Sequence, residues 1–147
     1  MVAAAGPASE TPSGRVIPED VWGILCIFAE ARGEPHEGQV AVGSVIRNRT
    51  ERKFFSVGTV ASTVLYPYQF SWCNTQDGQR TRVFSAKWDD AGWWAASKAW
   101  FESALSRPVG DATHYHSDAV SPAWSRSPRM SFVRQIGHHR FFRELVA

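Results

Sequence analysis

The sequence predicts an α+β fold, in which one mainly helical domain carries a small β element toward its C-terminus. Apolar residues recur at helical spacing in three segments before residue 108. After residue 112 the pattern changes to alternating and extended segments with turn residues between them. The 147 residues, of which 44% are hydrophobic and 20% charged, suffice for one domain with a real core but hardly for two.

The first 15 residues differ in composition from the rest of the chain. They are rich in Ala, Gly, Pro, Ser and Thr, which predicts a flexible arm over 1–15 followed by a single domain over 16–147. The arm lacks a cationic segment and its apolar run is short, so no secretory signal peptide is expected. No stretch approaches the roughly 20 apolar residues that a membrane span needs.

The first helix is expected to begin at residues 18–20, because their Pro-Glu-Asp triplet suits a first helical turn. An apolar stripe at helical spacing follows: Val21, Trp22, Leu25, Cys26, Phe28 and Ala29. The helix is therefore expected to be mostly buried and to run until Gly33, a residue type favoured just after a helix C-terminus. Glu30 falls in its last turn. For Cys26, a buried thiol and a bridge to Cys73 are both open, since two cysteines are too few for a disulfide scaffold.

The second helix is expected to begin near Pro35 and to continue through residues 38–49. Its Gly38 and Gly43 would let another backbone come close. The predicted apolar face consists of Ala41, Val42, Val45 and Ile46. This face indicates a second helix packed against the core.

The third helix is expected over residues 89–107, capped by Asp89 and Asp90 and stopped by Pro108. The tryptophans on helical faces are expected to be packing residues: Trp22, Trp93 and Trp100. Between the second and third helices, residues 66–82 predict a long loop, and long loops in compact domains are often functional.

The C-terminal part predicts the β element. Residues 112–117, ATHYHS, alternate between apolar and polar types, and residues 121–128, SPAWSRSP, are rich in turn formers. Residues 131–142, SFVRQIGHHRFF, read as extended segments. Together these segments predict a few strands packed on the helical body.

Glu30 meets two influences that favour a protonated carboxyl group. The negative end of the helix dipole lies there, and apolar neighbours remove water from the side chain. A glutamic acid kept protonated near neutral pH is what a general acid for glycosidic bond cleavage requires. A surface or ion-paired glutamate is the alternative for this residue taken alone. Glu34 is expected to turn away, and either to cap the next helix or to pair with Arg32 or Arg47.

Five motifs along the chain resemble, in order, the signatures of the SleB-type cell-wall hydrolases. The motifs are AEARGEPHEGQVAVGSVIRNR (29–49), QFSW (69–72), ATHYH (112–116), PAW (122–124) and IGHHRFF (136–142). The resemblance covers about residues 19–143. The family comprises spore-cortex-lytic enzymes, their proteobacterial relatives and phage endolysins.

The resemblance implies a lysozyme-like or lytic-transglycosylase-like domain that cleaves the β-1,4 bond between N-acetylmuramic acid and N-acetylglucosamine in peptidoglycan, without a cofactor. The first glutamate of the motif, Glu30 here, matches the family's catalytic residue. No other acid stands at a motif position with an obvious role across the cleft, which favours a lytic transglycosylase over a muramidase. Residues expected to bind the glycan are Gln69, Trp72, His114, Tyr115, His116, Trp124 and His138. Residues expected to support the site are Arg32, Gly33, Glu34 and Arg47.

Two other functions are weighed. On a strand, His114 and His116 point to one face, and His138 or His139 could add a third nitrogen for a catalytic Zn²⁺. This alternative is a zinc-dependent N-acetylmuramoyl-L-alanine amidase, whereas our expectation is that no metal is bound. A non-catalytic cell-wall-binding module would use the aromatic residues and the basic C-terminal segment, but it would not need an acid on a buried helix end.

The charge of the chain indicates which kinds of molecule it could bind. A net charge of +2 and a pI near 8.7 do not suggest a nucleic-acid binder. The segment from Arg126 to Arg143 nevertheless holds five arginines and no acid, and we expect it to contact an anionic cell surface, a solvated face being the alternative. We expect a monomer that binds peptidoglycan glycan strands. Like a phage endolysin, it would be made in the host cytoplasm and act on the cell wall after release at lysis.

Overall fold

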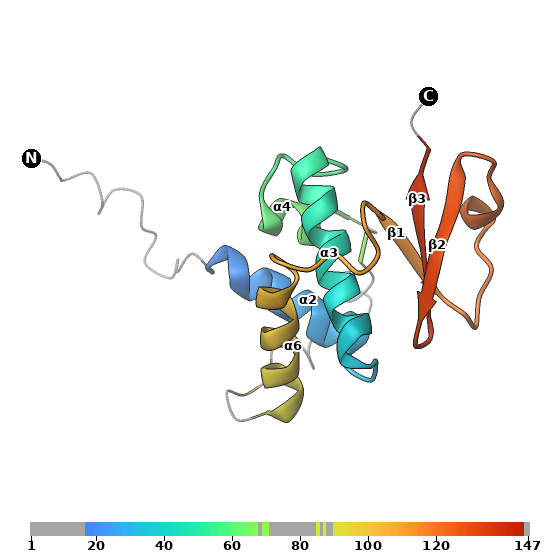
Figure 1. The fold of residues 1–147 in the computed structure, drawn as a ribbon. Helices are drawn as coiled ribbons and strands as arrows, with labels where there is room; N and C mark the ends of the chain where they lie inside the picture. The colour runs from blue at the N-terminus through green and yellow to red at the C-terminus, as the bar shows by residue number, and fades with distance from the viewer. Residues whose placement is uncertain (1–16, 68, 71–84, 86, 88–89, 146–147) are drawn as a thin grey trace, which may run out of the picture.

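The computed structural model describes residues 17–67, 69, 70, 85, 87 and 90–145. Within these residues the helices are α2 (Glu19–Ala31), α3 (His36–Arg52), α4 (Val60–Leu65) and α6 (Ala91–Glu102). A 3-10 turn, η2 (Ala123–Arg126), and three strands complete the order: β1 (His114–Ser117), β2 (Met130–Ile136) and β3 (His139–Glu144). Figure 1 shows the helices as one body and the strands as a layer beside α3. The predicted α+β class is confirmed.

Some expectations fall on residues outside these described ranges: the arm over 1–15, most of the loop over 66–82 with Trp72, and Cys73. Cys26, the other cysteine, is fully buried in the helical core. None of the helices in the described ranges is long and apolar enough to cross a membrane.

The start of α2 is tied to α4. Pro18 precedes the first residue of α2, as predicted, and Glu19 and Asp20 occupy the first turn. The carboxylate of Glu19 accepts hydrogen bonds from the backbone N–H groups of Val60 at 2.7 Å and Ala61 at 3.2 Å. These N–H groups open α4 and have no partner within their own helix, so Glu19 caps α4 while it starts α2.

The end of α2 differs from the prediction in its geometry. The helix ends at Ala31, and Arg32 still has right-handed dihedral angles. Gly33 follows the C-cap residue, as predicted, but it is not among the residues with a positive φ and does not adopt the left-handed conformation common at this position. The chain instead leaves the helix in a short turn, in which the N–H of Glu34 donates to the carbonyl of Ala31 at 2.9 Å. Glu30 lies in the last turn of α2, as expected.

Two glycines allow α2 and α3 to pack closely against α6. A Cβ at Gly23 of α2 would lie 2.6 Å from ring atoms of Trp100, and the Nε1 of Trp100 donates to Asp20 at 2.8 Å. A Cβ at Gly43 of α3 would lie 2.8 Å from the Oγ of Ser103, just after α6. Gly43 does allow a close approach, but its nearest neighbours are side-chain atoms of Ser103 and Ile27 rather than the backbone that the sequence predicts. Trp100, the largest fully buried side chain among the described residues, fills the centre.

Helix α6 is shorter than predicted. The carboxylate of Asp90 caps it by accepting from the N–H of Gly92 at 2.8 Å, but the helix ends at Glu102 rather than at residue 107. Ser103 is fully buried there, and its Oγ donates to the carbonyl of Trp100 at 2.6 Å. The tryptophans predicted to pack do so: Trp22, Trp93 and Trp100 all lie in or against the core.

The strands form an antiparallel sheet in the order β1-β3-β2. The second half of α3 holds the chain that leads into β1, because Arg49 Nε donates to the carbonyl of Thr113 at 2.6 Å and Asn48 Nδ2 donates to the carbonyl of Ala112 at 2.8 Å. Figure 1 accordingly shows β1 next to α3, with β3 and β2 farther out. The predicted β element is confirmed.

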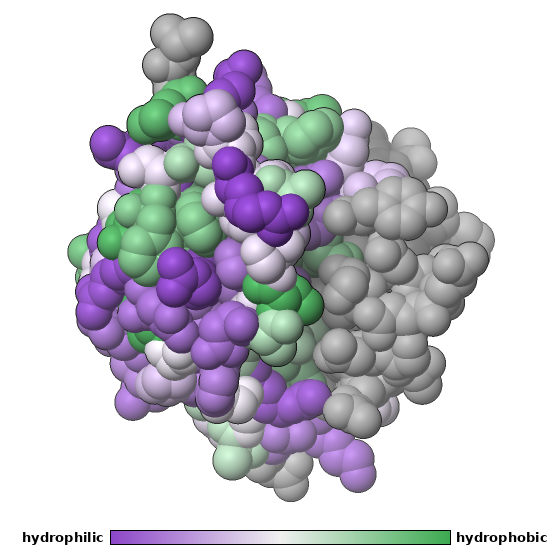
Figure 2. Space-filling model, turned by 90° about the vertical axis from the view of Figure 1, so that its right-hand side faces the viewer, coloured by the Kyte–Doolittle hydropathy of each residue, from purple (hydrophilic) through white to green (hydrophobic). Residues whose placement is uncertain are grey.

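The sheet has two distinct faces because side chains alternate along each strand. The core face carries Tyr115, His139 and Phe141, of which Phe141 is fully buried. The outer face carries His114, His116, Arg140 and Phe142, which pair across β1 and β3 and lie under η2. On the sheet side of the molecule, Figure 2 shows hydrophilic residues interleaved with small apolar patches rather than one apolar surface.

Candidate active site

Glu30 and Tyr115 meet where the end of α2 faces the sheet. The hydroxyl of Tyr115 donates to Glu30 Oε1 at 2.9 Å, across 85 residues of sequence. The neighbours of Glu30 on α2, Ala29 and Ala31, are buried, and Glu30 itself is partly buried. A carboxyl group is thereby held at a helix end with one oxygen engaged by a phenol.

The electrostatics of this pair fix the direction of its hydrogen bond. Burial raises the pKa of Tyr115 well above its ordinary value of 10.0, and the negative charge of Glu30 raises it further. The phenol therefore keeps its proton and acts as a donor to Glu30. The sequence predicted Tyr115 as a glycan contact, whereas its hydroxyl contacts Glu30.

Arg49 is a buried cation near this pair that the sequence analysis missed. Burial lowers the pKa of its guanidinium group from the ordinary 12.5, while the negative charge of Glu30 acts in the opposite direction. Its Cζ lies 5.0 Å from the ring centroid of Phe70, and among the described residues its Nη1 has no hydrogen-bond partner. A buried positive charge therefore acts on Glu30 from α3.

Glu34 is bound to the turn between β2 and β3. Its Oε1 accepts from the backbone N–H of His138 at 2.7 Å, and its Oε2 lies 3.1 Å from His138 Nδ1. Gly137, with φ of +58°, carries no side chain because a Cβ would collide with this carboxylate. Both predicted roles of Glu34 are wrong: α3 has no side-chain cap hydrogen bond, and His138, 104 residues away, provides the partners of Glu34 in place of Arg32 or Arg47.

His139 connects the two glutamates indirectly. Its ring centroid lies 4.9 Å from that of Tyr115, and its Nδ1 lies 3.9 Å from Glu34 Oε1, too long for a hydrogen bond. Burial lowers the pKa of His139, so the ring is neutral at neutral pH. The first residue of β3, directly after the turn that Glu34 holds, is thus in contact with the tyrosine that holds Glu30.

The other predicted glycan contacts on the strands lie on the outer face of the sheet. Trp124 of η2 contacts the rings of His114 and His116 at 5.1 and 5.5 Å. Burial and the charge of Arg49 lower the pKa of His114 to about 4. Alternation places this cluster opposite Tyr115, so the sequence grouped residues that the sheet separates.

The zinc alternative needs His138 or His139 to join His114 and His116. His139 pairs with Ser117 and shares the core face with Tyr115, opposite the other two histidines. His138 is held by Glu34. Among the described residues, no group of three or more His, Cys, Asp or Glu side chains is arranged to hold a metal ion.

The remaining predicted site residues lie in different surroundings. Arg32 places its Cζ 4.7 Å from the ring centroid of Phe28, and Gly33 is exposed, with no atom within 4 Å of the position that a Cβ would take. Arg47 packs against α6, with its Cζ 3.8 Å from the Trp100 ring centroid, and stabilises the helical body rather than the site. The partly buried Gln69 forms a turn through its backbone, and Trp72 lies outside the described residues.

Known proteins resemble this chain in sequence and in fold. Residues 33–142 match the cell wall hydrolase family. The spore cortex-lytic enzyme of Oceanobacillus iheyensis is 31% identical over 125 residues, covering 78% of this chain and 38% of that protein. The spore cortex-lytic enzyme of Bacillus subtilis is 43% identical over 53 residues, covering 36% of this chain and 16% of that protein. The chain thus spans less than two fifths of the length of these two relatives.

A solved structure gives the same fold. The catalytic domain of the germination-specific lytic transglycosylase SleB from Bacillus anthracis superposes with a TM-score of 0.67 and 27% identity, covering 89% of this chain and 98% of that domain. The fold is therefore that of an α+β domain of the SleB catalytic type. The chain belongs to the cell wall hydrolase family.

Proposed function

We propose that the protein is a lytic transglycosylase that cleaves the β-1,4 bond between N-acetylmuramic acid and N-acetylglucosamine, with Glu30 as its catalytic residue. The observation that carries the proposal is the Glu30–Tyr115 hydrogen bond at the end of α2. It is supported by the fold that the chain shares with a lytic transglycosylase domain.

Glu30 acts first as an acid and then as a base. Its proton passes to the glycosidic oxygen as the bond from that oxygen to C1 of the muramic residue breaks, leaving an oxocarbenium-like sugar. The C6 hydroxyl of the same sugar then attacks C1 and returns its proton to Glu30. The product is a 1,6-anhydro end, and no water is consumed. Tyr115 donates to Oε1 and keeps the carboxyl group oriented during both proton transfers.

Glu34 is the natural candidate for the second carboxylate that a two-carboxylate mechanism requires. Both of its oxygens face the turn between β2 and β3, where His138 engages each of them. A carboxylate engaged in this way supports the fold of the turn and is poorly placed to attack a sugar. This favours transglycosylation over hydrolysis.

Mass spectrometry of purified peptidoglycan digested by the protein tests this proposal. Anhydromuramic ends are expected, with the same products in the presence of a chelator. Reducing muramic ends would indicate a muramidase instead, and released stem peptides that disappear with chelator would indicate a zinc amidase. The role as a phage endolysin is supported by the sequence resemblance alone and stays a prediction.

A further inference from the structure

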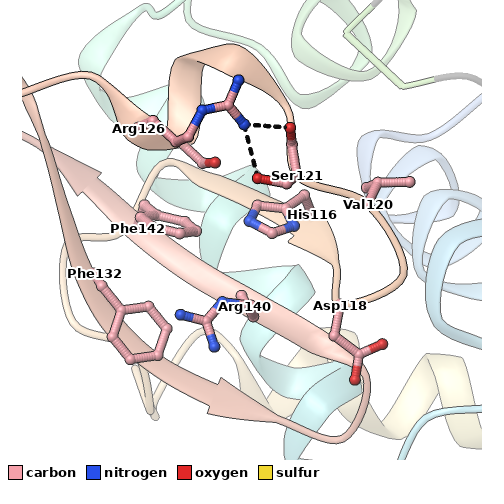
Figure 3. Close-up of a pocket in the computed structure, with 9 residues that line it drawn as sticks. His116, Asp118, Val120, Ser121, Arg126, Phe132, Arg140 and Phe142 are labelled. Atoms are coloured by element: carbon pink, nitrogen blue, oxygen red, sulfur yellow. Dashed lines mark hydrogen bonds between the residues drawn. The ribbon is translucent and has the colours of Figure 1, made fainter.

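In the folded protein, carboxylates offset part of the positive charge of the basic C-terminal segment, which runs from Arg126 to Arg143. Three of its five arginines lie within 4 Å of a carboxylate: Arg129 near Glu144, Arg134 near Glu37 and Arg143 near Asp111. Across the described ranges, Arg126 and Arg140 make their hydrogen bonds to neutral groups and form no ion pair. Both line one pocket on the outer face of the sheet (Figure 3). The positive charge that remains is therefore concentrated there.

Neutral groups hold both guanidinium groups in place. Arg126 Nη1 donates to the backbone carbonyl of Ser121 at 2.6 Å and to its Oγ at 2.7 Å. Arg140 Nη1 donates to Gln135 Oε1 at 3.2 Å, and its Cζ lies 4.2 Å from the ring centroid of Phe132. A guanidinium group has five N–H donors, so each keeps free donors and its full charge. Because the groups are already ordered, an anion would bind with a small entropic cost.

The rest of the lining suits a peptide. In Figure 3 the His116–Phe142 pair lies between the two arginines, and these rings stack with centroids 5.2 Å apart. His116 Nδ1 lies 2.7 Å from the carbonyl of Ser117, so Nδ1 carries the proton and a neutral ring offers Nε2 as an acceptor for an amide N–H. Phe132 is 46% exposed and offers an apolar surface.

The charge and size of the pocket narrow the class of ligand. Its volume is about 550 Å³, which suits a ligand of a few residues. Asp118 also lines it, leaving two guanidinium charges against one carboxylate. The pocket and the candidate active site lie on opposite faces of the sheet and meet at the edge strand β1, where Tyr115 contacts Glu30 and the next residue, His116, lines the pocket.

We propose that this pocket binds a carboxylate-bearing stem peptide of the peptidoglycan strand that Glu30 cleaves. The choice of polymer rests on the proposed function. Arg126 and Arg140 bind the peptide carboxylate, since charge-assisted arginine–carboxylate hydrogen bonds are among the strongest in proteins. His116 Nε2 accepts a peptide N–H, and Phe132 covers an apolar side chain of the peptide.

Binding of a soluble stem tetrapeptide to the full chain carrying Glu30→Gln tests the proposal by NMR titration. Peptide with free carboxylates is expected to bind at least about tenfold more tightly than the same peptide with its carboxylates amidated. Arg126→Gln and Arg140→Gln are each expected to weaken binding at least about fivefold. Arg129→Gln, in the same segment but paired with Glu144, is the matched control and is expected to leave binding unchanged.

The peptide has no glycosidic bond, so this test is independent of cleavage. Equal affinity for the free and amidated peptides would overturn the pocket assignment, and this comparison needs no arginine variant that might misfold. A loss of affinity with Arg129→Gln as large as with Arg126→Gln or Arg140→Gln would also overturn it. So would displacement of the peptide by equimolar inorganic phosphate, which would indicate a phosphate-bearing polymer. Peptide binding without cleavage of peptidoglycan by the wild type would instead leave the pocket standing and overturn the proposed function.

Discussion

At the scale of single residues, the site depends on one hydrogen bond between distant parts of the chain. Tyr115 holds Oε1 of Glu30, and burial keeps its phenol protonated as a donor. Arg49 adds a buried positive charge from α3. The sequence predicts Glu30 as the catalytic residue from its place at a helix end and from the motif that it shares with the cell-wall hydrolases. Arg49 was missed because an arginine near the end of a helix resembles an exposed residue, and no local pattern marks its burial.

Tyr115→Phe removes the hydroxyl that donates to Glu30 and keeps the ring against His139 and Phe141. Its kcat on purified peptidoglycan is expected to fall about tenfold or more, because hydrogen bonds to charged groups contribute about 1.5–3 kcal/mol. The melting temperature should change little. Tyr66→Phe, at an exposed tyrosine, is the matched control. An unchanged rate for Tyr115→Phe would show that the donor is dispensable.

Stability should depend on pH through His114. Its pKa is lowered from 6.5 to about 4 in the folded state, so the unfolded chain takes up this proton first as the pH falls. The contribution of neutral His114 to the free energy of unfolding is therefore fully present above pH 6.5 and is lost progressively as the pH falls to about 4. The melting temperature of His114→Gln should therefore fall less than that of the wild type over this range. Parallel curves for the two proteins would contradict the shift.

At the scale of elements, the helices and strands follow from the sequence, but their contacts do not. Helical periodicity and turn residues predicted α2, α3, α6 and the sheet. The six residues of α4 escaped notice because a capping box at Thr59, rather than an apolar period, defines them. The partner of Glu34 was missed because the strand register that brings His138 to it is set by pairing between β2 and β3.

Glu34→Gln tests the connection between α2 and this turn. The amide oxygen of a glutamine can still accept from the N–H of His138, but its NH2 group then faces Nδ1, which must move its proton to Nε2 to accept this hydrogen bond. The melting temperature is expected to fall by several degrees, corresponding to about 1–3 kcal/mol, while activity per folded molecule falls less. Glu37→Gln, at an exposed acid paired with Arg134, is the control. A stable but inactive Glu34→Gln variant would give Glu34 a catalytic role.

Gly43 is tightly packed whereas Gly33 faces open space, so the same substitution should affect stability differently at the two positions. Gly43→Ala would force a Cβ within 2.8 Å of Ser103 and is expected to lower stability by about 1–3 kcal/mol. Gly33→Ala meets no atom within 4 Å and needs no positive φ, so its stability should stay the same or rise slightly. Thermal unfolding of both variants measures the difference. Equal destabilisation would mean that Gly33 has a packing role that its surroundings do not show.

At the scale of the whole molecule, a helical body presents Glu30 to one face of a sheet whose other face forms the arginine pocket. Alternation along β1 decides which residue serves which face: Tyr115 turns to Glu30, and His116 to the pocket. Alternation in the sequence already predicts that these two residues lie on opposite faces, but it does not tell which face the helices cover. The predicted contact of the C-terminal segment, Arg126 to Arg143, with an anionic cell surface stays a prediction.

The central claim is that one carboxyl group, Glu30, performs the cleavage. The most direct test compares the rate at which Glu30→Gln and the wild type release soluble fragments from purified peptidoglycan, with circular dichroism confirming that both are folded. The amide matches the carboxyl in shape but cannot donate the proton, so a loss of about 10²- to 10⁴-fold is expected. A folded Glu30→Gln variant that keeps more than about a tenth of the wild-type rate would contradict the assignment.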